Sequence, residues 1–286
     1  MITVHTIREL REHVRAARAS GRRIGFVPTM GNLHDGHISL IQRSIDAGCF
    51  TVASIFVNPL QFNDKNDLAR YPRTLPEDQA RLSSAGCDLL FAPDVDEMYP
   101  NGQDQQSIVH VPEVSDGLCG ASRPGHFDGV STVVTKLFNQ VLPDVAFFGQ
   151  KDFQQVAVIR KMVADLCMPL EIVAVPTKRA DDGLALSSRN GYLNAEEREL
   201  ATGLYLTLNE IADDFRAGKA IDASLSAATE RLNGRGFRTD YLEIRRVDDL
   251  KPASLNDADV VILGAAFLGP ARLIDNLQVS LNRPGD

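Results

Sequence analysis

The sequence predicts an α/β protein in which a doubly wound parallel sheet is followed by a smaller α+β domain. Two observations lead to this prediction. Short apolar runs alternate with helical patterns to about residue 176, as in proteins with a buried parallel sheet. Beyond residue 180 the alternation stops, and two helical segments precede two strand-like runs. We therefore expect a first domain over residues 1–180 and a second domain over residues 181–286.

The first domain is expected to begin with a helix. Thr6 and Glu9 have the spacing of a capping box, apolar residues then recur with helical period, and Gly21 ends the segment. The expected strands cover residues 24–27, 49–57, 88–92, 145–148 and 170–175, with a weaker candidate at 107–111. Helices are expected from residue 38 to about 47, from 76 to 86, over 130–138 and after 152. Such alternation is typical of a Rossmann-like sheet, in which ligands bind outside the carboxyl ends of the strands.

The second domain is expected to open with one long helix. Asn194 caps this helix, which should continue to Phe215. A helix over 223–232 and strands over 241–247 and 260–267 follow. The segment from Arg179 to Asn190 joins the domains, and we expect it to act as a hinge.

The composition of the chain argues against several classes of function. The chain has 286 residues, a net charge of -8 and no basic block, which argues against a nucleic-acid partner. No apolar run approaches the ~20 residues of a membrane helix. Four scattered cysteines without a Cys-x-x-Cys pair argue against a zinc site and against disulfides. The arginine-rich N-terminus also contains Glu9 and Glu12, so we expect a structural helix rather than a transit peptide, and a cytoplasmic protein.

The stretch from Phe26 to His37 is the strongest functional signal. An apolar strand ends in a glycine-bearing turn, and two histidines three residues apart precede a helix. Helix N-termini offer unpaired N–H groups and the positive end of the dipole, so they bind phosphates. The histidines could instead be a core pair or part of a metal site, but a helical zinc site prefers histidines at i and i+4 with a third ligand. We therefore expect His34 and His37 to face nucleotide phosphates.

Three further groups lie in expected loops or at helix starts. Lys151 puts a cation at a helix start, where the dipole disfavours it, and a bound phosphate would explain that placement better than a surface role. The Ser187–Arg189 loop offers two hydroxyls and an arginine to a triphosphate, although a simple capping loop is at least equally compatible. Gln61 and Gln155 present amide donors and acceptors that suit a small polar acid.

Taken together, these stretches are similar to the pantoate–β-alanine ligase (pantothenate synthetase) family. The matching segments run in family order over nearly the whole chain, at residues 28–31, 34–37, 56–62, 71–74, 123–127, 148–155 and 186–190. The resemblance implies a two-step reaction of the nucleotidyltransferase superfamily. The pantoate carboxylate attacks the α-phosphorus of ATP to give pantoyl adenylate and pyrophosphate. The amine of β-alanine then displaces AMP to form pantothenate.

The resemblance also implies roles for individual residues. The catalytic donors would be His34, His37, Lys151, Ser187, Ser188 and Arg189. ATP would further contact Met30, Gly31, Asn32, Leu33, Asp35, Gly36, Gly149, Gln150, Asp152, Lys178 and Leu186. Pantoate would contact Gln61, Gln155, Asn58, Val134, Leu137 and Phe148, and β-alanine would lie near Gln61. Mg²⁺ would accompany ATP with unassigned ligands, the second domain would close as a lid, and the protein would be a homodimer.

Three positions depart from the family pattern, and two other functions compete. Cys119 stands where many members carry glutamate, which puts the anchoring of the loop before Arg123 in question. Gln150 replaces an acid, and Lys178 replaces an apolar residue near the expected adenine. A nucleotide adenylyltransferase would share the histidine turn, but it would leave the two glutamines and the lack of a basic cleft unexplained. A non-enzymatic nucleotide-binding regulator would bind ATP without releasing pyrophosphate.

Overall fold

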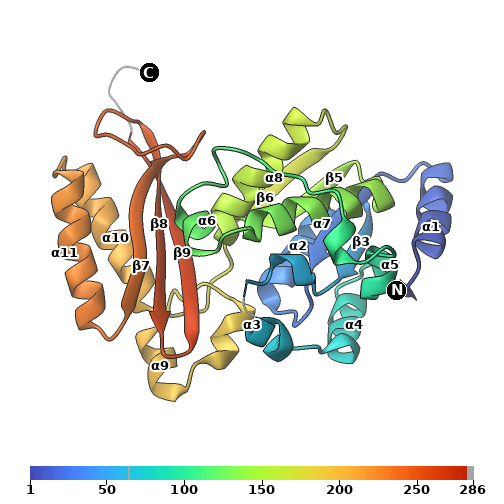
Figure 1. Cartoon of the computed structure of the whole chain (residues 1–286), viewed down its shortest axis with the longest axis horizontal. Helices are drawn as coiled ribbons and strands as arrows, with labels where there is room; N and C mark the ends of the chain where they lie inside the picture. Colours follow the sequence, from blue (N-terminus) through green and yellow to red (C-terminus); the bar gives the residue numbers. More distant parts are fainter. Residues whose placement is uncertain (64, 282–286) are drawn as a thin grey trace. The chain divides into compact units, whose positions relative to one another are not determined.

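The computed structural model describes residues 1–63 and 65–281, which divide into two compact units (Figure 1). The first unit contains residues 1–150 and 158–176, and the second contains residues 151–157 and those from 177 onwards. A short segment that begins at Lys151 therefore belongs to the second unit although it lies inside the sequence of the first. The expected division after residue 180, as a boundary between independent domains, stays a prediction.

Six parallel strands of the described chain form one sheet in the first unit. They are β1 (Ile2–Val4), β2 (Ile24–Thr29), β3 (Phe50–Ile55), β4 (Leu89–Phe91), β5 (Val145–Gly149) and β6 (Glu171–Val175), in the spatial order β1-β4-β3-β2-β5-β6. Phe26 of β2 pairs with Val52 on one side and with Ala146 on the other. The strand order reverses between β2 and β5, which is the switch point where such sheets bind ligands. The predicted doubly wound sheet is confirmed.

Helices connect these strands. The longer ones are α1 (Ile7–Ala19), α2 (Asp35–Asp46), α4 (Leu75–Ser84), α7 (His126–Val141) and α8 (Phe153–Asp165), and the shorter ones are α3 (Lys65–Arg70), α5 (Val95–Met98) and α6 (Leu118–Ser122). Thr6 and Glu9 form the predicted capping box of α1. Helix α1 packs with α7 and α2 packs with α4. Ile24, Phe26 and Val27 of β2 are fully buried, as expected for a strand covered on both faces.

The second unit has a helical layer on an antiparallel sheet. Its described strands are β7 (Arg238–Arg246), β8 (Asp259–Leu268) and β9 (Ala271–Ser280), in that order, and its helices are α9 (Ala195–Leu200), α10 (Gly203–Arg216) and α11 (Ile221–Gly234). Leu204, Leu208 and Ile211 of α10 belong to its hydrophobic core. The predicted smaller α+β unit is thus confirmed. No helix in the described part of the chain is long and apolar enough to cross a membrane.

The predicted strand at residues 107–111 is wrong. No strand is found there within the described residues, because side chains of α7 occupy the backbone groups that a neighbouring strand would use. The Val109 N–H donates to the Thr132 hydroxyl at 2.9 Å, and the Val109 carbonyl accepts from the Ser131 hydroxyl at 2.5 Å.

The long helix expected between Asn194 and Phe215 is also wrong in one respect. Asn194 does cap it, but the helix is interrupted between α9 and α10. The Thr202 hydroxyl donates to the Glu199 carbonyl at 3.3 Å, and Gly203, a poor helix former, follows. Strands β1 and β9 were not predicted. Only three residues long, β1 carries little pattern, and the polar pair Asp275-Asn276 interrupts the apolar pattern of β9.

Candidate active site

The turn after β2 is shaped by one glycine and one buried carboxylate. Gly31 has φ +80°, and a Cβ atom there would lie 3.0 Å from an Asp78 carboxylate oxygen and 3.1 Å from the Ile55 side chain. Asp78 of α4 is 2% exposed and accepts the backbone N–H groups of Asn32 at 2.9 Å and Leu33 at 2.7 Å. A substitution of Gly31 would therefore disturb both the backbone conformation and this carboxylate.

The two histidines cap the helix that follows this turn. Helix α2 begins at Asp35, earlier than the sequence indicated, with His34 as its N-cap residue. The Gly36 N–H donates to His34 Nδ1 at 3.1 Å, and the His34 N–H donates to His37 Nδ1 at 3.2 Å. The ring centroids lie 4.1 Å apart. The histidines thus form a reciprocal capping box, in which imidazole nitrogens replace the usual hydroxyl and carboxylate oxygens.

This geometry determines the tautomer of both rings. A ring nitrogen that accepts a hydrogen bond carries no proton, so in the neutral form the proton of each imidazole lies on Nε2. Both rings, which lie at the N-terminus of α2, therefore carry their N–H donor on Nε2. Fixed donors and a helix dipole at one place favour a bound phosphate.

A network of amides lies beyond β3, which neighbours β2 in the sheet. The Asn58 amide nitrogen donates to the Gly129 carbonyl and to Gln61 Oε1, both at 3.1 Å. The Asn58 amide oxygen accepts the Tyr99 hydroxyl at 2.7 Å and the Leu60 N–H at 3.4 Å. A backbone carbonyl only accepts and a backbone N–H only donates, so these contacts fix which end of the Asn58 amide is nitrogen. Asn58 is 1% exposed, and its hydrogen-bonding capacity is used inside the protein.

The orientation of the Asn58 amide determines that of the Gln61 amide. Because Gln61 Oε1 accepts from Asn58, the Gln61 amide nitrogen points away from Asn58 and lies 3.0 Å from the Met30 sulfur. Gln61 is therefore held as a hydrogen-bond donor beside the turn after β2. Burial raises the pKa of the Tyr99 phenol, which keeps its hydroxyl protonated as the donor to Asn58.

Side chains from a later segment also hold the backbone carbonyl of Gln61 in place. Its carbonyl lies 2.9 Å from His126 Nδ1 and accepts Arg123 Nη2 at 3.2 Å, while Arg123 Nη1 lies 3.1 Å from His126 Nε2. Arginine only donates, so His126 Nε2 accepts and Nδ1 carries the proton to Gln61. Arg123 is thus anchored although Cys119 stands where glutamate was expected.

The three apolar residues assigned to pantoate are buried. Val134 and Leu137 lie one turn apart on α7, Phe148 lies on β5, and their exposed fractions are 5%, 3% and 4%. The Phe148 and Phe138 rings meet edge to face at 6.3 Å. These contacts make the three residues part of the core, and a contact with pantoate stays a prediction.

The remaining predicted site residues belong mainly to the second unit. Lys151 is 16% exposed at its side chain, with Nζ 3.7 Å from the Asp152 carboxylate. The Ser187 hydroxyl accepts the Arg189 N–H at 3.2 Å and caps a 3₁₀ turn, Ser188–Tyr192. Lys151 and Ser187 line one small cavity of this unit. The Lys178 side chain is exposed and its carbonyl accepts the Leu186 N–H at 3.0 Å, so Lys178 supports the loop through its backbone.

The side chains that could bind a metal indicate how Mg²⁺ would be held. No group of three or more His, Cys, Asp or Glu residues that could hold a metal occurs in residues 1–63 and 65–281. Mg²⁺ usually keeps several waters and binds through phosphates with one or two carboxylates. These residues are therefore compatible with Mg²⁺ that is carried by the phosphates of ATP rather than by a protein cage.

The family profile described as pantoate-beta-alanine ligase matches residues 2–278. The chain belongs to the pantoate–β-alanine ligase family. It is 60% identical to the pantothenate synthetase of Pseudomonas fluorescens strain Pf0-1 over 285 residues, which is 99% of this chain and 100% of the relative. It is also 60% identical to the pantothenate synthetase of Stutzerimonas stutzeri over 98% of this chain and 99% of the relative.

Solved structures of the ligase family have the same fold. The pantothenate synthetase of Thermus thermophilus superposes with a TM-score of 0.90 at 47% identity, covering 97% of this chain and 99% of the other. The pantoate-beta-alanine ligase of Francisella tularensis, complexed with beta-gamma ATP and beta-alanine, superposes with a TM-score of 0.83 at 37% identity, covering 97% of each chain.

Several supporting residues of this ligase were missed from the sequence. No role is predicted from the sequence for Asp78, and Arg123 and His126 lie in a segment that matches the family without an assigned role. The sequence predicts no role for Tyr99 either. These residues reach partners 41 to 65 residues away in the sequence, and no local pattern indicates such a pair.

Proposed function

We propose that this protein condenses pantoate with β-alanine in an ATP-dependent reaction that releases AMP and pyrophosphate. One observation of the structure supports this best. Two imidazole Nε2–H donors after β2 and one fixed amide donor after β3 stand at the ends of neighbouring strands. A phosphate and a small carboxylic acid are the groups that such neighbouring donors suit.

The first step is attack of a pantoate carboxylate oxygen on the α-phosphorus of ATP. The bond to the pyrophosphate oxygen breaks, and negative charge grows on the leaving phosphates. His34 and His37 donate Nε2–H bonds to phosphate oxygens, and Lys151, Ser187, Ser188 and Arg189 supply further donors. Loss of one such donor costs about 3–4 kcal/mol of transition-state stabilisation.

The second step is attack of the β-alanine amine on the acyl carbon of pantoyl adenylate. AMP leaves with the bonding electron pair, and the amine loses a proton. No side chain forms a covalent intermediate, because the adenylate is itself an activated acyl group. Water would hydrolyse it, so closure of the second unit as a lid is part of the proposal.

The remaining contacts are assigned as follows. ATP contacts the turn residues Met30, Gly31, Asn32, Leu33, Asp35 and Gly36, together with Gly149, Gln150, Asp152, Lys178 and Leu186. Pantoate oxygens are bound by Gln61 and Gln155, its methyl groups pack on Val134, Leu137 and Phe148, and β-alanine lies near Gln61. Asn58 acts on pantoate through Gln61, because its own donors and acceptors are occupied. Mg²⁺ enters with ATP.

One assay separates the ligase from its two competitors. The protein is incubated with ATP and pantoate, with and without β-alanine, and pyrophosphate and amide product are measured. Pantoate-dependent pyrophosphate and a β-alanine-dependent amide would support the ligase. Pyrophosphate release that requires a nucleotide acceptor instead would support an adenylyltransferase. ATP binding without pyrophosphate under any condition would support a regulator and contradict the proposal.

Assembly and location are further parts of the proposal. We expect a homodimer, as the family resemblance implies, and a cytoplasmic protein. Sedimentation velocity at micromolar concentration tests the first point, and a mass near 31 kDa would contradict it. Fractionation of cells that produce the protein tests the second, and recovery with the membrane fraction would contradict it.

A further inference from the structure

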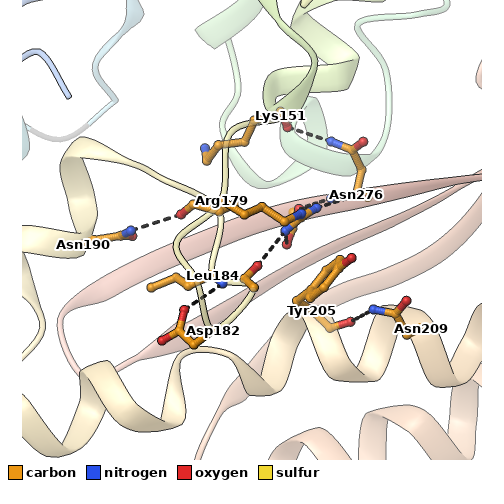
Figure 2. A network of polar contacts seen from close by, with 11 residues as sticks. Lys151, Arg179, Asp182, Leu184, Asn190, Tyr205, Asn209 and Asn276 are labelled. Carbon is orange, nitrogen blue, oxygen red and sulfur yellow. Dashed lines mark hydrogen bonds and ion pairs between the residues drawn. The ribbon is translucent and has the colours of Figure 1, made fainter. Parts of the chain in front are cut away.

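A partly buried ion pair links two segments of the second unit. Arg179 and Asp275 form a bidentate pair, with Nη1–Oδ2 at 2.6 Å and Nη2–Oδ1 at 2.9 Å (Figure 2). The Asp275 side chain is 4% exposed, and the Arg179 guanidinium stacks on the Tyr205 ring at 3.8 Å from its centroid. Burial of two charges costs much of what their attraction returns, so such a pair is weak evidence for a role in stability alone. The pair is better explained by the segments that it holds in place.

On one side the pair holds the hairpin that leads to the Ser187–Arg189 loop. Arg179 forms a bridge with Ala185, and Arg179 Nη1 also donates to the Gly183 carbonyl at 3.1 Å. Asn190, just beyond the loop, donates to the Ala185 carbonyl at 3.0 Å. Both ends of the loop are thus attached to the hairpin that Arg179 closes (Figure 2).

On the other side the next residue of β9 holds the main chain of Lys151. Asn276 Nδ2 donates to the Lys151 carbonyl at 2.8 Å, while the Asn276 N–H donates to Asp275 Oδ1 at 2.8 Å. Arg179 Nη2 also donates to the Asn276 carbonyl at 3.3 Å. Successive strand residues point to opposite faces, so Asp275 and Asn276 reach two different segments from one point of β9. The cavity lined by Lys151, Ser187 and Asn190 lies against this point.

We propose that Arg179, Asp275 and Asn276 are positioning residues that hold Lys151 and the Ser187–Arg189 loop at a fixed spacing for the phosphates of ATP. This inference rests on the proposed function, because it requires both segments to bind ATP. It goes further by making β9 the common support of two segments that are 36 residues apart in the sequence. It also gives a physical reason why residues 151–157 belong to the second unit.

Arg179→Lys tests the support of the loop. Lysine keeps the charge but lacks the planar fork that makes the bidentate contact. Arg272→Lys is the matched control, because Arg272, on β9, also forms a partly buried ion pair, with Asp240, and its side-chain exposure of 15% is close to the 19% of Arg179. We expect Arg179→Lys to raise KM for ATP about tenfold and to lower kcat for pyrophosphate release, with KM for pantoate unchanged. Equal activities of the two variants, at similar unfolding midpoints, would overturn the inference.

A double-mutant cycle tests the support of Lys151. The dissociation constant of ATP is measured by calorimetry for Asn276→Ala, Lys151→Ala and the double variant, because binding remains measurable where turnover is lost. We expect Asn276→Ala to weaken ATP binding about tenfold in the parent chain and less than about twofold when Lys151 is already alanine. Equal losses in both backgrounds would overturn this inference alone. Unchanged ATP binding in Lys151→Ala would overturn both the inference and the role of Lys151 in the proposed function.

Discussion

At the residue scale, the chemistry of the site depends on which atoms carry protons. His34 and His37 accept backbone N–H groups at Nδ1, and this places their donors at Nε2. Gln61 is turned by Asn58 so that its nitrogen remains a donor. In the proposed reaction, each of these side chains is thus oriented by a group that does not itself react. Removal of the side chain and removal of the group that orients it should therefore have different kinetic consequences.

His37→Ala should abolish adenylate formation while the fold survives. The variant loses one Nε2–H donor to the phosphates, and the rate of pantoate-dependent pyrophosphate release should fall about 10²–10³-fold. His110→Ala is the control, because His110 is exposed and pairs with Asp128 at 2.8 Å. Turnover of His37→Ala near that of the control would show that the assigned role is wrong.

Tyr99→Phe should affect pantoate more than ATP. The variant removes the hydroxyl that donates to Asn58 at 2.7 Å and so loosens the orientation of Gln61. One lost hydrogen bond of about 1 kcal/mol corresponds to a rise in KM for pantoate of about fivefold. Steady-state kinetics with each substrate varied in turn measures it, with Tyr241→Phe of β7 as the control. A proportional loss for ATP would contradict the split.

At the element scale, helices supply contacts that fix neighbouring turns. The start of α4 provides Asp78 to the turn after β2, and α7 provides Gly129 and His126 to the segment after β3. In the second unit, α10 and α11 are joined by charged side chains. The first kind of contact should influence catalysis, and the second should influence only stability.

Asp78→Asn should weaken the turn after β2. Asparagine keeps one acceptor oxygen, so one of the N–H groups of Asn32 and Leu33 loses its partner and an amide nitrogen faces it instead. We expect a loss of about 1–3 kcal/mol in the free energy of unfolding and weaker ATP binding. Urea denaturation and calorimetry measure the two effects. Destabilisation with unchanged ATP affinity would show that the turn does not depend on Asp78 for its function.

Glu210→Gln should change the pH dependence of stability. Burial by itself raises the pKa of Glu210, but hydrogen bonds from Arg235, the C-cap residue of α11, and from Arg231 of α11 outweigh it and hold the pKa below its ordinary value. A lowered folded-state pKa stabilises the protein above the unfolded-state value, and this contribution is lost as the pH falls through the folded-state value. The side chain is 36% exposed, so we expect only about 0.5 kcal/mol after screening.

Urea midpoints at about pH 7 and about pH 3.5 test this expectation. The difference between the parent chain and Glu210→Gln should be present at the higher pH and shrink at the lower. Asp213→Asn serves as the control, because its partner Arg216 lies on the same helix and the Asp213 side chain is 78% exposed. A difference that grows as the pH falls would contradict the assigned direction of the pKa shift.

At the scale of the whole molecule, no single boundary in the sequence separates the two units. Residues 151–157 belong with the chain from residue 177 onwards, so Lys151, a predicted site residue, belongs to the second unit although it lies within the sequence of the first. A chain truncated after Pro176 retains the strands of the parallel sheet but loses β9 and Asn276. We expect it to retain the helix and strand signal in circular dichroism and to lose pantoate-dependent pyrophosphate release. Release at the rate of the full chain would contradict this expectation.

The sequence by itself determined the fold class, most elements and the chemical type of the site. Apolar runs, capping residues and the glycine turn act between residues close in the chain, so their patterns can be read without tertiary structure. The strand at 107–111 was wrong because its backbone groups bond to Ser131 and Thr132, more than 20 residues away. The break between α9 and α10 depended on one side-chain contact that competes with helical bonding.

Only the tertiary structure decided how the site residues are oriented. The tautomer of the histidines required the true start of α2, and the direction of the Gln61 amide required Tyr99 and Gly129, which lie 41 and 71 residues from Asn58. The common support of Lys151 and the Ser187–Arg189 loop required Arg179 and Asp275, 96 residues apart. A sequence pattern records which groups are present. Hydrogen bonds depend on where distant groups meet, and only the folded chain brings them together.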